Sequence, residues 1–461
     1  MSRSPTDGVE PPVATQLADR IGSLRADHLP APVRETCEQL LIDVIGLCIA
    51  ARRTDYVAAA LAAWPDAGPA TAIAHARPLG AAGAAFVNGT AAHGEDFDDT
   101  FEGGPVHAGA VIVPAVLAAA EQESLGGAAV LLGMAVGAET ICRLSLVVPK
   151  AVHKAGFHPT AVFGALGAAA GVGAALGLDR ARLTHALGLA GSMAGGIIEY
   201  LADGSWTKRM YPGWAAQSGL RAALLARAGF KGPATVLEGT HGLFQAFAHS
   251  RDGNYAALTG DFGARWVIET LAFKPYPCGT MMQPYVDCAR RLTSRGLAPG
   301  DIAEIICEVA EGTVHRLWEP LAAKQAPPNG YAAKFATPYG IAAALLHGNL
   351  GFDAFTDAAV ADPAVRALAA KIRYEIDPAN PYPNAYTGHV RVRRTDGGLL
   401  EERQNHLRGG AQAPLARLEL EEKFANNACH GGWSDRQTAA VLALTHALWT
   451  QPRVDLRPLR G

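Results

Sequence analysis

Apolar residues recur at helical spacing from about Val13 to Arg265, and strand-like alternation is nearly absent there. Pro30 and Pro32 open one such run, PVRETCEQLLIDVIGLCIAAR. Ala-rich segments of the same kind follow it: GAAGAAFVNGTAAH, AVIVPAVLAAAEQ, GAAVLLGMAVGAETICRLSL, DRARLTHALGLAGSMAGGI and AAQSGLRAALLARAGF. This pattern predicts an all-α region.

The pattern changes after Trp266. DIAEIICEVAEG and KIRYEI alternate apolar and polar residues, and HVRVRRTDGGLLEER is typical of two strands joined at an Asp-Gly turn. ATPYGIAAALLHGNL predicts a helix between them, and DAAVADPAVRALAAKI predicts another. Near the end of the chain, DRQTAAVLALTHALW returns to a helical pattern.

We therefore expect a mostly α fold, with a large all-α helical domain and a smaller α+β lid domain. The predicted division is a disordered Pro-rich tail at 1–12, a helical domain at 13–268 and 406–461, and a lid at 269–405. A length of 461 residues also favours two domains over one. A pocket between a helical body and a lid would be a natural ligand site.

Composition narrows the class of partner. With 40 Lys+Arg against 43 Asp+Glu, the formal net charge is −3, so we expect neither nucleic acid nor a membrane as partner. A polyanionic substrate would need a local basic pocket. The seven cysteines are scattered without a CxxC pair, which predicts no disulfide framework and no zinc ribbon and favours a cytoplasmic location. The polar start of the chain lacks the apolar core of a signal peptide.

One segment, Thr160 to Leu178, is uncharged over almost the length of a membrane span. It consists largely of Ala and Gly, which insert poorly into a bilayer. Small side chains also let helix backbones approach closely, so we interpret it as a close-packed helix in a soluble bundle.

The densest candidate site is AHGEDFDDT, from Ala92 to Thr100, followed by GGPVH, which ends at His107. Four acids fall within five positions, namely Glu95, Asp96, Asp98 and Asp99. Three interpretations remain open. The acids could cap a helix or shape a loop, the carboxylates and histidines could hold a divalent ion, or they could make acid–base or substrate contacts without a metal.

Two further motifs precede small-residue helices. In GFHPT, Pro159 suits the first helical position and places His158 near the N-cap, where an anion meets free backbone N–H groups. In WTKRMYPG, Lys208 and Arg209 stand at a helix start, where cations oppose the helix dipole unless an anionic ligand lies nearby. A packed histidine and a plain surface pair are the respective alternatives.

The last two motifs lie in the predicted lid. In FKPYPCG, Pro275 and Pro277 stiffen the backbone and would fix where Lys274 points, although a hinge has the same composition. In KFATPY, Tyr339 opens an apolar helix and could equally belong to the core. Walker, GxGxxG and GxSxG patterns are absent from the sequence.

Taken in order, AAHGEDFDDT with its following His, GFHPTA, KRMYPGWAAQSG, KPYPCG and AKFATPYG make the chain resemble the MmgE/PrpD family, from about Ala14 to Leu448. That family includes 2-methylcitrate dehydratase, cis-aconitate decarboxylase and iminodisuccinate epimerase. The resemblance implies a helical domain with an α+β lid, a homodimer, no cofactor, no metal, and a small polycarboxylate as substrate.

The resemblance also assigns site residues. The catalytic ones would be His107, His158, Lys208, Tyr339 and Asp96, and the substrate-binding ones Lys274, Thr100, Arg209 and His93. The chain departs from the family pattern at two points. The interval from Thr100 to His107 is one residue longer than in the decarboxylase branch, and Gln283 stands where the family carries a histidine that could titrate.

The resulting hypothesis is that lysines neutralise substrate carboxylates while His158 or His107 moves a proton at the adjacent carbon. Asp96 would orient an imidazole, and Tyr339 or Thr100 would donate a proton. We expect a hydro-lyase like 2-methylcitrate dehydratase first, an epimerase or isomerase second and a decarboxylase third. A non-catalytic polycarboxylate-binding homologue, which Gln283 favours, and a metal hydrolase using the acidic loop are the rivals.

Overall fold

The computed structural model describes residues 10–461, which fold into two compact units. Unit 1 comprises the described residues up to Gly94 together with Gly103–Glu269 and Phe424–Gly461, and unit 2 comprises Glu95–Glu102 and Thr270–Lys423. Of the predicted tail at 1–12, the first nine residues lie outside the described residues, and the next three precede the first helix without regular structure. The predicted mostly α fold is confirmed.

Unit 1 is built from helices. The longer ones are α1 (Val13–Gly22), α2 (Ala31–Ala51), α3 (Asp55–Ala62), α4 (Ala81–His93), α5 (Gly109–Glu123), α6 (Gly127–Val147), α8 (Pro159–Ala175), α9 (Arg180–Met193), α11 (Thr207–Arg227) and α22 (Asp435–Ala447). The shorter ones are α7 (Ala151–Lys154), α10 (Tyr200–Asp203), α12 (Leu243–Ala248) and α13 (Ala256–Thr259), while α21 (Arg417–His430) runs from unit 2 into unit 1.

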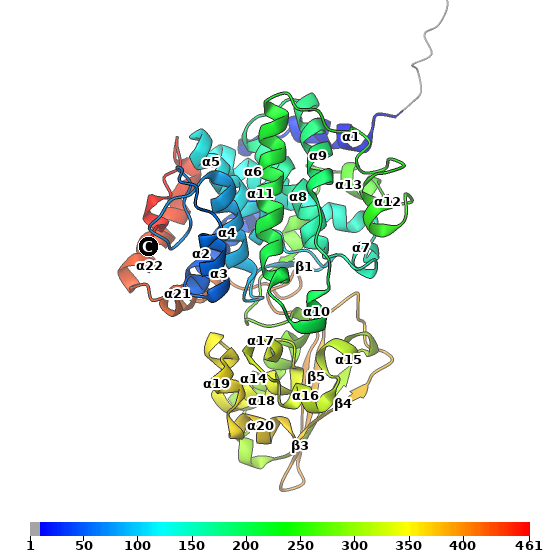
Figure 1. Ribbon diagram of the computed structural model, residues 1–461. Coiled ribbons are helices and arrows are strands. Elements are labelled where there is room, and N and C mark those ends of the chain that lie inside the picture. The colour runs from blue at the N-terminus through cyan, green and yellow to red at the C-terminus, as the bar shows by residue number, and fades with distance from the viewer. Residues whose placement is uncertain (1–9) are drawn as a thin grey trace, which may run out of the picture. The chain divides into compact units, whose positions relative to one another are not determined.

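The small-residue helix α8 lies at the centre of unit 1, packed against α5, α6, α9 and α11 (Figure 1). All its residues are buried. Its backbone approaches α6 so closely that a Cβ atom added at Gly171 would lie 2.6 Å from the carbonyl oxygen of Gly133. The glycines and alanines of this segment therefore serve helix–helix contact, which confirms the interpretation of Thr160 to Leu178 as a close-packed helix.

Within the described part of the chain, one helix is long and apolar enough to cross a membrane. This helix is α6 and not the uncharged segment from Thr160 to Leu178. In its most apolar stretch of 18 residues, 89% of the residues are buried inside the protein. Burial of this kind is what a core helix shows, so this helix is weak evidence for a membrane span.

Unit 2 combines a sheet with short helices. Its main sheet has the strand order β4-β3-β5-β6, in which β3 pairs parallel with β4 and antiparallel with β5, and β5 pairs antiparallel with β6. The elements of the unit are β1 (Thr100–Phe101), β2 (Leu271–Ala272), α14 (Gln283–Ser294), β3 (Ile302–Val309), α15 (Glu311–Leu317), α16 (Leu321–Gln325), α17 (Gly330–Ala333), α18 (Thr337–His347), α19 (Asp357–Val360), α20 (Pro363–Ala369), β4 (Ile372–Ile376), β5 (Gly388–Arg394) and β6 (Leu399–Gln404). The strands predicted from alternation are confirmed, including the pair joined at the Asp-Gly turn.

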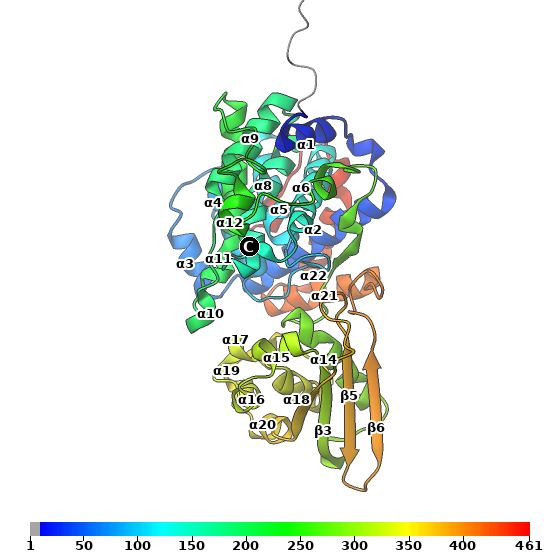
Figure 2. The ribbon, with the colours of Figure 1, turned by 90° about the vertical axis from the view of Figure 1, so that its right-hand side faces the viewer.

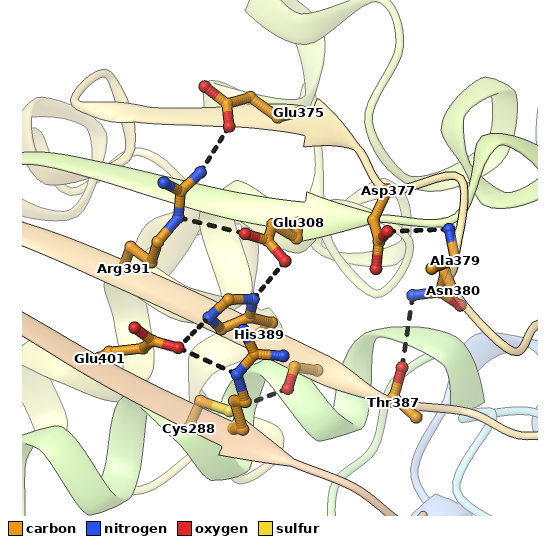
Figure 3. Close-up of polar contacts among 12 residues, drawn as sticks. Cys288, Glu308, Glu375, Asp377, Ala379, Asn380, Thr387, His389, Arg391 and Glu401 are labelled. Carbon is orange, nitrogen blue, oxygen red and sulfur yellow. Dashed lines mark hydrogen bonds and ion pairs between the residues drawn. The ribbon is translucent and has the colours of Figure 1, made fainter.

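One face of this sheet packs on helices and forms an apolar core with α14, α18 and α20 (Figure 2). On strands β3, β4, β5 and β6, charged side chains form a chain of contacts (Figure 3). His389 lies between two carboxylates, with Nδ1 2.5 Å from Glu308 and Nε2 2.8 Å from Glu401. Arg391 continues the series to Glu308 at 3.4 Å and to Glu375 at 2.5 Å. Such cross-strand pairs stabilise the register of a sheet.

Two segments expected with the helical domain belong to unit 2. The first, Glu95–Glu102, joins it because β1 pairs antiparallel with β2. The second, residues 406–423, joins it because the backbone N–H of Phe273 donates to the carbonyl of Gly409 at 2.9 Å. Both contacts link residues far apart in the sequence, which local patterns do not reveal.

Candidate active site

The predicted site residues fall into two groups. Unit 1 carries His93, His107, His158, Lys208 and Arg209, and unit 2 carries Asp96, Thr100, Lys274, Tyr339 and Gln283.

Three histidines gather in unit 1. The ring centroids of His93 and His107 are 4.8 Å apart, and His158 lies 6.0 Å from the first and 6.3 Å from the second. His93 is the last residue of α4, His107 precedes α5, and His158 precedes α8. Three separate segments thus bring their imidazoles together, as a proton-transfer site requires.

The local sequence explains how two of these histidines are held. Pro159 is the first residue of α8 and His158 is its N-cap, as GFHPT predicts. The backbone N–H of His158 donates to the carbonyl of Gly196 at 2.9 Å. The backbone N–H of His107 donates to the hydroxyl of Thr160 at 3.1 Å, so the first turn of α8 positions both residues.

His158 is buried and favours its neutral form. Burial, and then the neighbouring charge of Lys208, holds the pKa of this imidazole well below its usual range, with smaller contributions from His93 and His107. Its Nδ1 has no hydrogen-bond partner among residues 10–461. A neutral imidazole with an available nitrogen is suited to accept a proton from a substrate.

Two tyrosines flank this imidazole. The ring of Tyr211 lies 5.7 Å from that of His158, and the ring of Tyr200 lies 6.3 Å from it. The hydroxyl of Tyr211 donates to the carbonyl of Ile197. The sequence analysis missed both, although Tyr211 belongs to the motif WTKRMYPG that drew attention to its neighbours.

Lys208 and Arg209 lie in the first turn of α11, as the sequence predicts. Lys208 is buried, with 8% of its surface exposed. The guanidinium of Arg209 lies 4.5 Å from the ring centroid of Tyr56 and 5.9 Å from that of Trp206, within the range of cation–π attraction. Two cations at a helix N-terminus are unfavourable because that end of the helix dipole is also positive, and an anion bound nearby would offset this cost.

In unit 2 the acidic segment Glu95–Phe97 is held by three buried lysines. Lys334, Lys274 and Lys423 donate to the backbone carbonyls of its three successive residues, at 2.9, 2.9 and 2.8 Å. We call this arrangement the lysine cradle. Lys274 was predicted as a site residue, whereas Lys423 lies in no motif and Lys334 was quoted only within KFATPY.

The carboxylates of the same segment balance these charges. Lys274 lies 3.5 Å from a carboxylate oxygen of Asp96, and Lys334 lies 3.0 Å from one of Glu95. Asp96 has a φ of 56°, a left-handed conformation that Asp tolerates better than most residues. The segment is therefore a shaped loop fixed by charge.

Thr100 and Tyr339 have structural partners in unit 2. Thr100 lies in β1 opposite Ala272. Tyr339 is fully buried on α18, and its hydroxyl donates to the carbonyl of Ala354. Burial also raises the pKa of Tyr339 to about 12. The hydroxyl of Tyr339 can donate its proton to a substrate only if its hydrogen bond to Ala354 breaks.

Gln283 replaces the histidine that the family resemblance leads one to expect. It is fully buried, and its amide nitrogen donates to the backbone carbonyls of Tyr276 at 3.3 Å and Cys278 at 3.1 Å. One side-chain amide thus holds both ends of the segment Tyr276–Cys278 in place. A neutral imidazole has one N–H and could satisfy only one of these carbonyls.

Unit 1 also has ligands that a metal ion could use. His93 and His107 are close enough to share a divalent ion, and imidazole suits zinc, copper, iron and nickel. The same two rings can equally relay a proton. Chelation experiments separate these uses.

The two units carry the following groups. A helical unit presents three clustered imidazoles beside a buried ammonium group, and an α+β unit presents a lysine-held acidic loop. Imidazoles are side chains that can transfer protons, and ammonium groups are side chains that can bind anions. The model of the MmgE/PrpD N-terminal domain matches residues 15–256, and that of the MmgE/PrpD C-terminal domain matches residues 276–447. The chain belongs to the MmgE/PrpD family.

Relatives of known name are lyases. Human cis-aconitate decarboxylase is 32% identical over 361 residues, which cover 75% of this chain and 72% of the relative. A cis-aconitate decarboxylase-like protein of Aspergillus oryzae is 26% identical over 89% of both chains, and cis-aconitate decarboxylase of Aspergillus terreus is 28% identical over 61% of this chain and 60% of its own. The similarity supports a lyase-type family without selecting one reaction.

Proposed function

We propose that this protein is a cofactor-free lyase that moves a proton next to a carboxylate of a small di- or tricarboxylate, acting as a hydro-lyase on a substrate like 2-methylcitrate. The observation that carries the proposal is the buried, neutral imidazole of His158 among His93, His107 and Lys208. A base that stays neutral near pH 7 can remove a proton from carbon once a cation offsets the charge that develops there.

The proposed dehydration balances as follows. Nδ1 of His158 takes the proton from the carbon beside a carboxylate, and the electron pair of that C–H bond forms the new double bond. The C–O bond on the neighbouring carbon breaks, and the departing hydroxide takes a proton from His107 to leave as water. Lys208 and Arg209 hold the substrate carboxylates and stabilise the negative charge of the transition state.

Unit 2 contributes further proposed residues. Lys274 is proposed as a third cation for a substrate carboxylate. Asp96, which it contacts, and Thr100, which pairs with Ala272 in β2 just before it, complete the proposed set. Tyr339 is the weakest member of the proposed set, because its hydroxyl already serves Ala354. We also propose a homodimer, which sedimentation of the purified protein tests directly.

Decarboxylation is the second candidate, and the names of the matched relatives favour it. In this reaction the bond to a carboxylate breaks, carbon dioxide leaves, and the electron pair enters the neighbouring double bond before a proton is added at carbon. An imidazolium must then supply the proton. The lowered pKa of His158 suits the removal of a proton better than its storage, and for this reason we rank dehydration first.

Incubation in deuterium oxide with a panel of di- and tricarboxylates tests the proposal. NMR would show deuterium at a carbon beside a carboxylate, a new double bond from dehydration, or carbon dioxide release from decarboxylation. Lys208→Ala and His158→Gln are expected to lower turnover by about 100-fold or more while the protein stays folded. Tricarboxylate binding without exchange or turnover would instead identify a non-catalytic homologue.

A chelation control belongs to the same experiment. Full turnover after prolonged treatment with a chelator is the expected result for a metal-free acid–base mechanism. Loss of turnover that returns with one added divalent ion would replace this mechanism by a metal-dependent one at His93 and His107.

A further inference from the structure

A single aromatic ring in unit 1 contacts the chain beside two of the proposed site residues. Tyr56, the second residue of α3, is buried with 5% of its surface exposed. Its ring lies against Gly94, which directly follows His93, and against Arg209, which directly follows Lys208.

The contact with Gly94 leaves no space. A Cβ atom added at Gly94 would overlap the phenol ring of Tyr56. The φ of Gly94 is −59°, a conformation open to any residue. The ring, and not the backbone conformation, therefore requires a glycine after His93.

The contact with Arg209 fixes the start of α11. The guanidinium lies over the Tyr56 ring at 4.5 Å, and Trp206, the residue before α11, meets the same ring edge-on with centroids 6.2 Å apart. The guanidinium of Arg209 thus contacts the rings of both Tyr56 and Trp206, and Lys208 lies between Trp206 and Arg209 in the sequence.

We infer that Tyr56 is a positioning residue, which sets the distance between the chain segments that carry His93 and Lys208. This inference rests on the proposed function, since it assigns those two side chains to the reaction. Tyr56 itself takes no part in the proton transfer. Misplacing a reacting group by about 1 Å can lower turnover by about 100-fold.

The structure supplies a matched control on the same two helices. Phe86 of α4 meets Trp214 of α11 edge-on at 6.5 Å, away from His93 and Lys208 in sequence. Phe86→Leu removes an aromatic contact between α4 and α11, the two helices at whose ends Tyr56 contacts Gly94 and Arg209. It is expected to lower stability while leaving kcat near the wild-type value.

The test compares five variants of the full-length protein, including the control Phe86→Leu, by kcat, KM and thermal unfolding. Tyr56→Leu and Gly94→Ala are each expected to lower kcat by about 10- to 100-fold, with a smaller change in KM. Tyr56→Phe, which keeps the ring, is expected to keep most of kcat. In the double variant, Gly94→Ala should add little to the effect of Tyr56→Leu, because the ring that it meets is gone.

A second measurement is independent of turnover. The imidazole NMR signals of His93, assigned by their loss in His93→Gln, should shift in Tyr56→Leu and Gly94→Ala and stay unchanged in Phe86→Leu. Wild-type kcat and unshifted signals in both Tyr56→Leu and Gly94→Ala would overturn the inference, as would an equal loss of kcat in Tyr56→Phe and Tyr56→Leu. If the wild-type protein turns over no carboxylate, the proposed function fails, and the NMR comparison alone judges the positioning role.

Discussion

Acidification should destabilise this protein partly through one histidine. Burial and the nearby ammonium of Lys208 hold the pKa of His158 well below its usual value, so the folded state does not take up the proton that the unfolded chain binds. The sign follows from that difference. The stabilising contribution is complete above the unfolded pKa of about 6.5 and is lost as the pH falls toward the folded value.

The expected size comes from the same linkage. Each pH unit below about 6.5 costs about 1.4 kcal/mol for one such group. Between pH 7.5 and pH 5, His158 would therefore remove up to about 2 kcal/mol from the free energy of unfolding. His158→Gln keeps a buried polar side chain of similar length but cannot titrate, so its stability should fall less over this range.

Urea unfolding followed by circular dichroism at several pH values measures the difference. The curve of wild type minus His158→Gln isolates this residue, and His28→Gln, at a site that is 78% exposed, controls for the loss of a histidine as such. Parallel pH profiles for the wild type and His158→Gln would refute the reasoning. Because His158 stays neutral below its usual pKa, we also expect turnover to persist below about pH 6.5.

Three further predictions concern packing and charge. Lys334→Met should lower the free energy of unfolding by about 3 kcal/mol, because it leaves the partly buried carboxylate of Glu95 and the backbone carbonyl of the same residue without their cation; chemical denaturation measures this. Gly171→Ala should cost about 1 to 3 kcal/mol despite the better helix propensity of Ala, since its methyl group meets a backbone carbonyl, whereas Gly22→Ala, with open space around it, should be near neutral in the same thermal melts. His389→Gln should destabilise unit 2 by less than Lys334→Met, and added salt should reduce that cost, as repeated melts at two ionic strengths would show.

Local signals predicted much of the fold. Proline at the first helical position marked the start of α8 at Pro159, and alternation with an Asp-Gly turn marked β5 and β6. These features depend on neighbours within a few residues, so a sequence reveals them. The small-residue composition of α8 likewise predicted close packing, because glycine and alanine allow it wherever their partners lie in the chain.

The parts that the sequence did not reveal depend on distant residues. Tyr56 lies on α3 and Arg209 on α11, which are far apart in the sequence, so no local pattern links the two residues. Gln283 was recognised as a departure from the family pattern, but its two hydrogen bonds to the Tyr276–Cys278 segment were not. A contact between side chains that are distant in the sequence produces no periodic pattern of residues, so the three-dimensional structure is needed to find it.

The acidic segment shows how such a distant partner changes an interpretation. Four acids in five positions suggest caps, a metal or a reaction centre when the sequence is considered alone. The lysines that hold Glu95–Phe97 follow it by 178, 239 and 326 residues, and two of them lie within 4 Å of the carboxylates of Glu95 and Asp96. A buried ammonium group is unfavourable without a negative charge nearby. Glu95 and Asp96 therefore stabilise the folded protein whether or not a ligand binds. Substitution of either acid should therefore lower stability as well as turnover. A loss of turnover at these positions identifies a catalytic role only if the variant unfolds at the same temperature as the wild type.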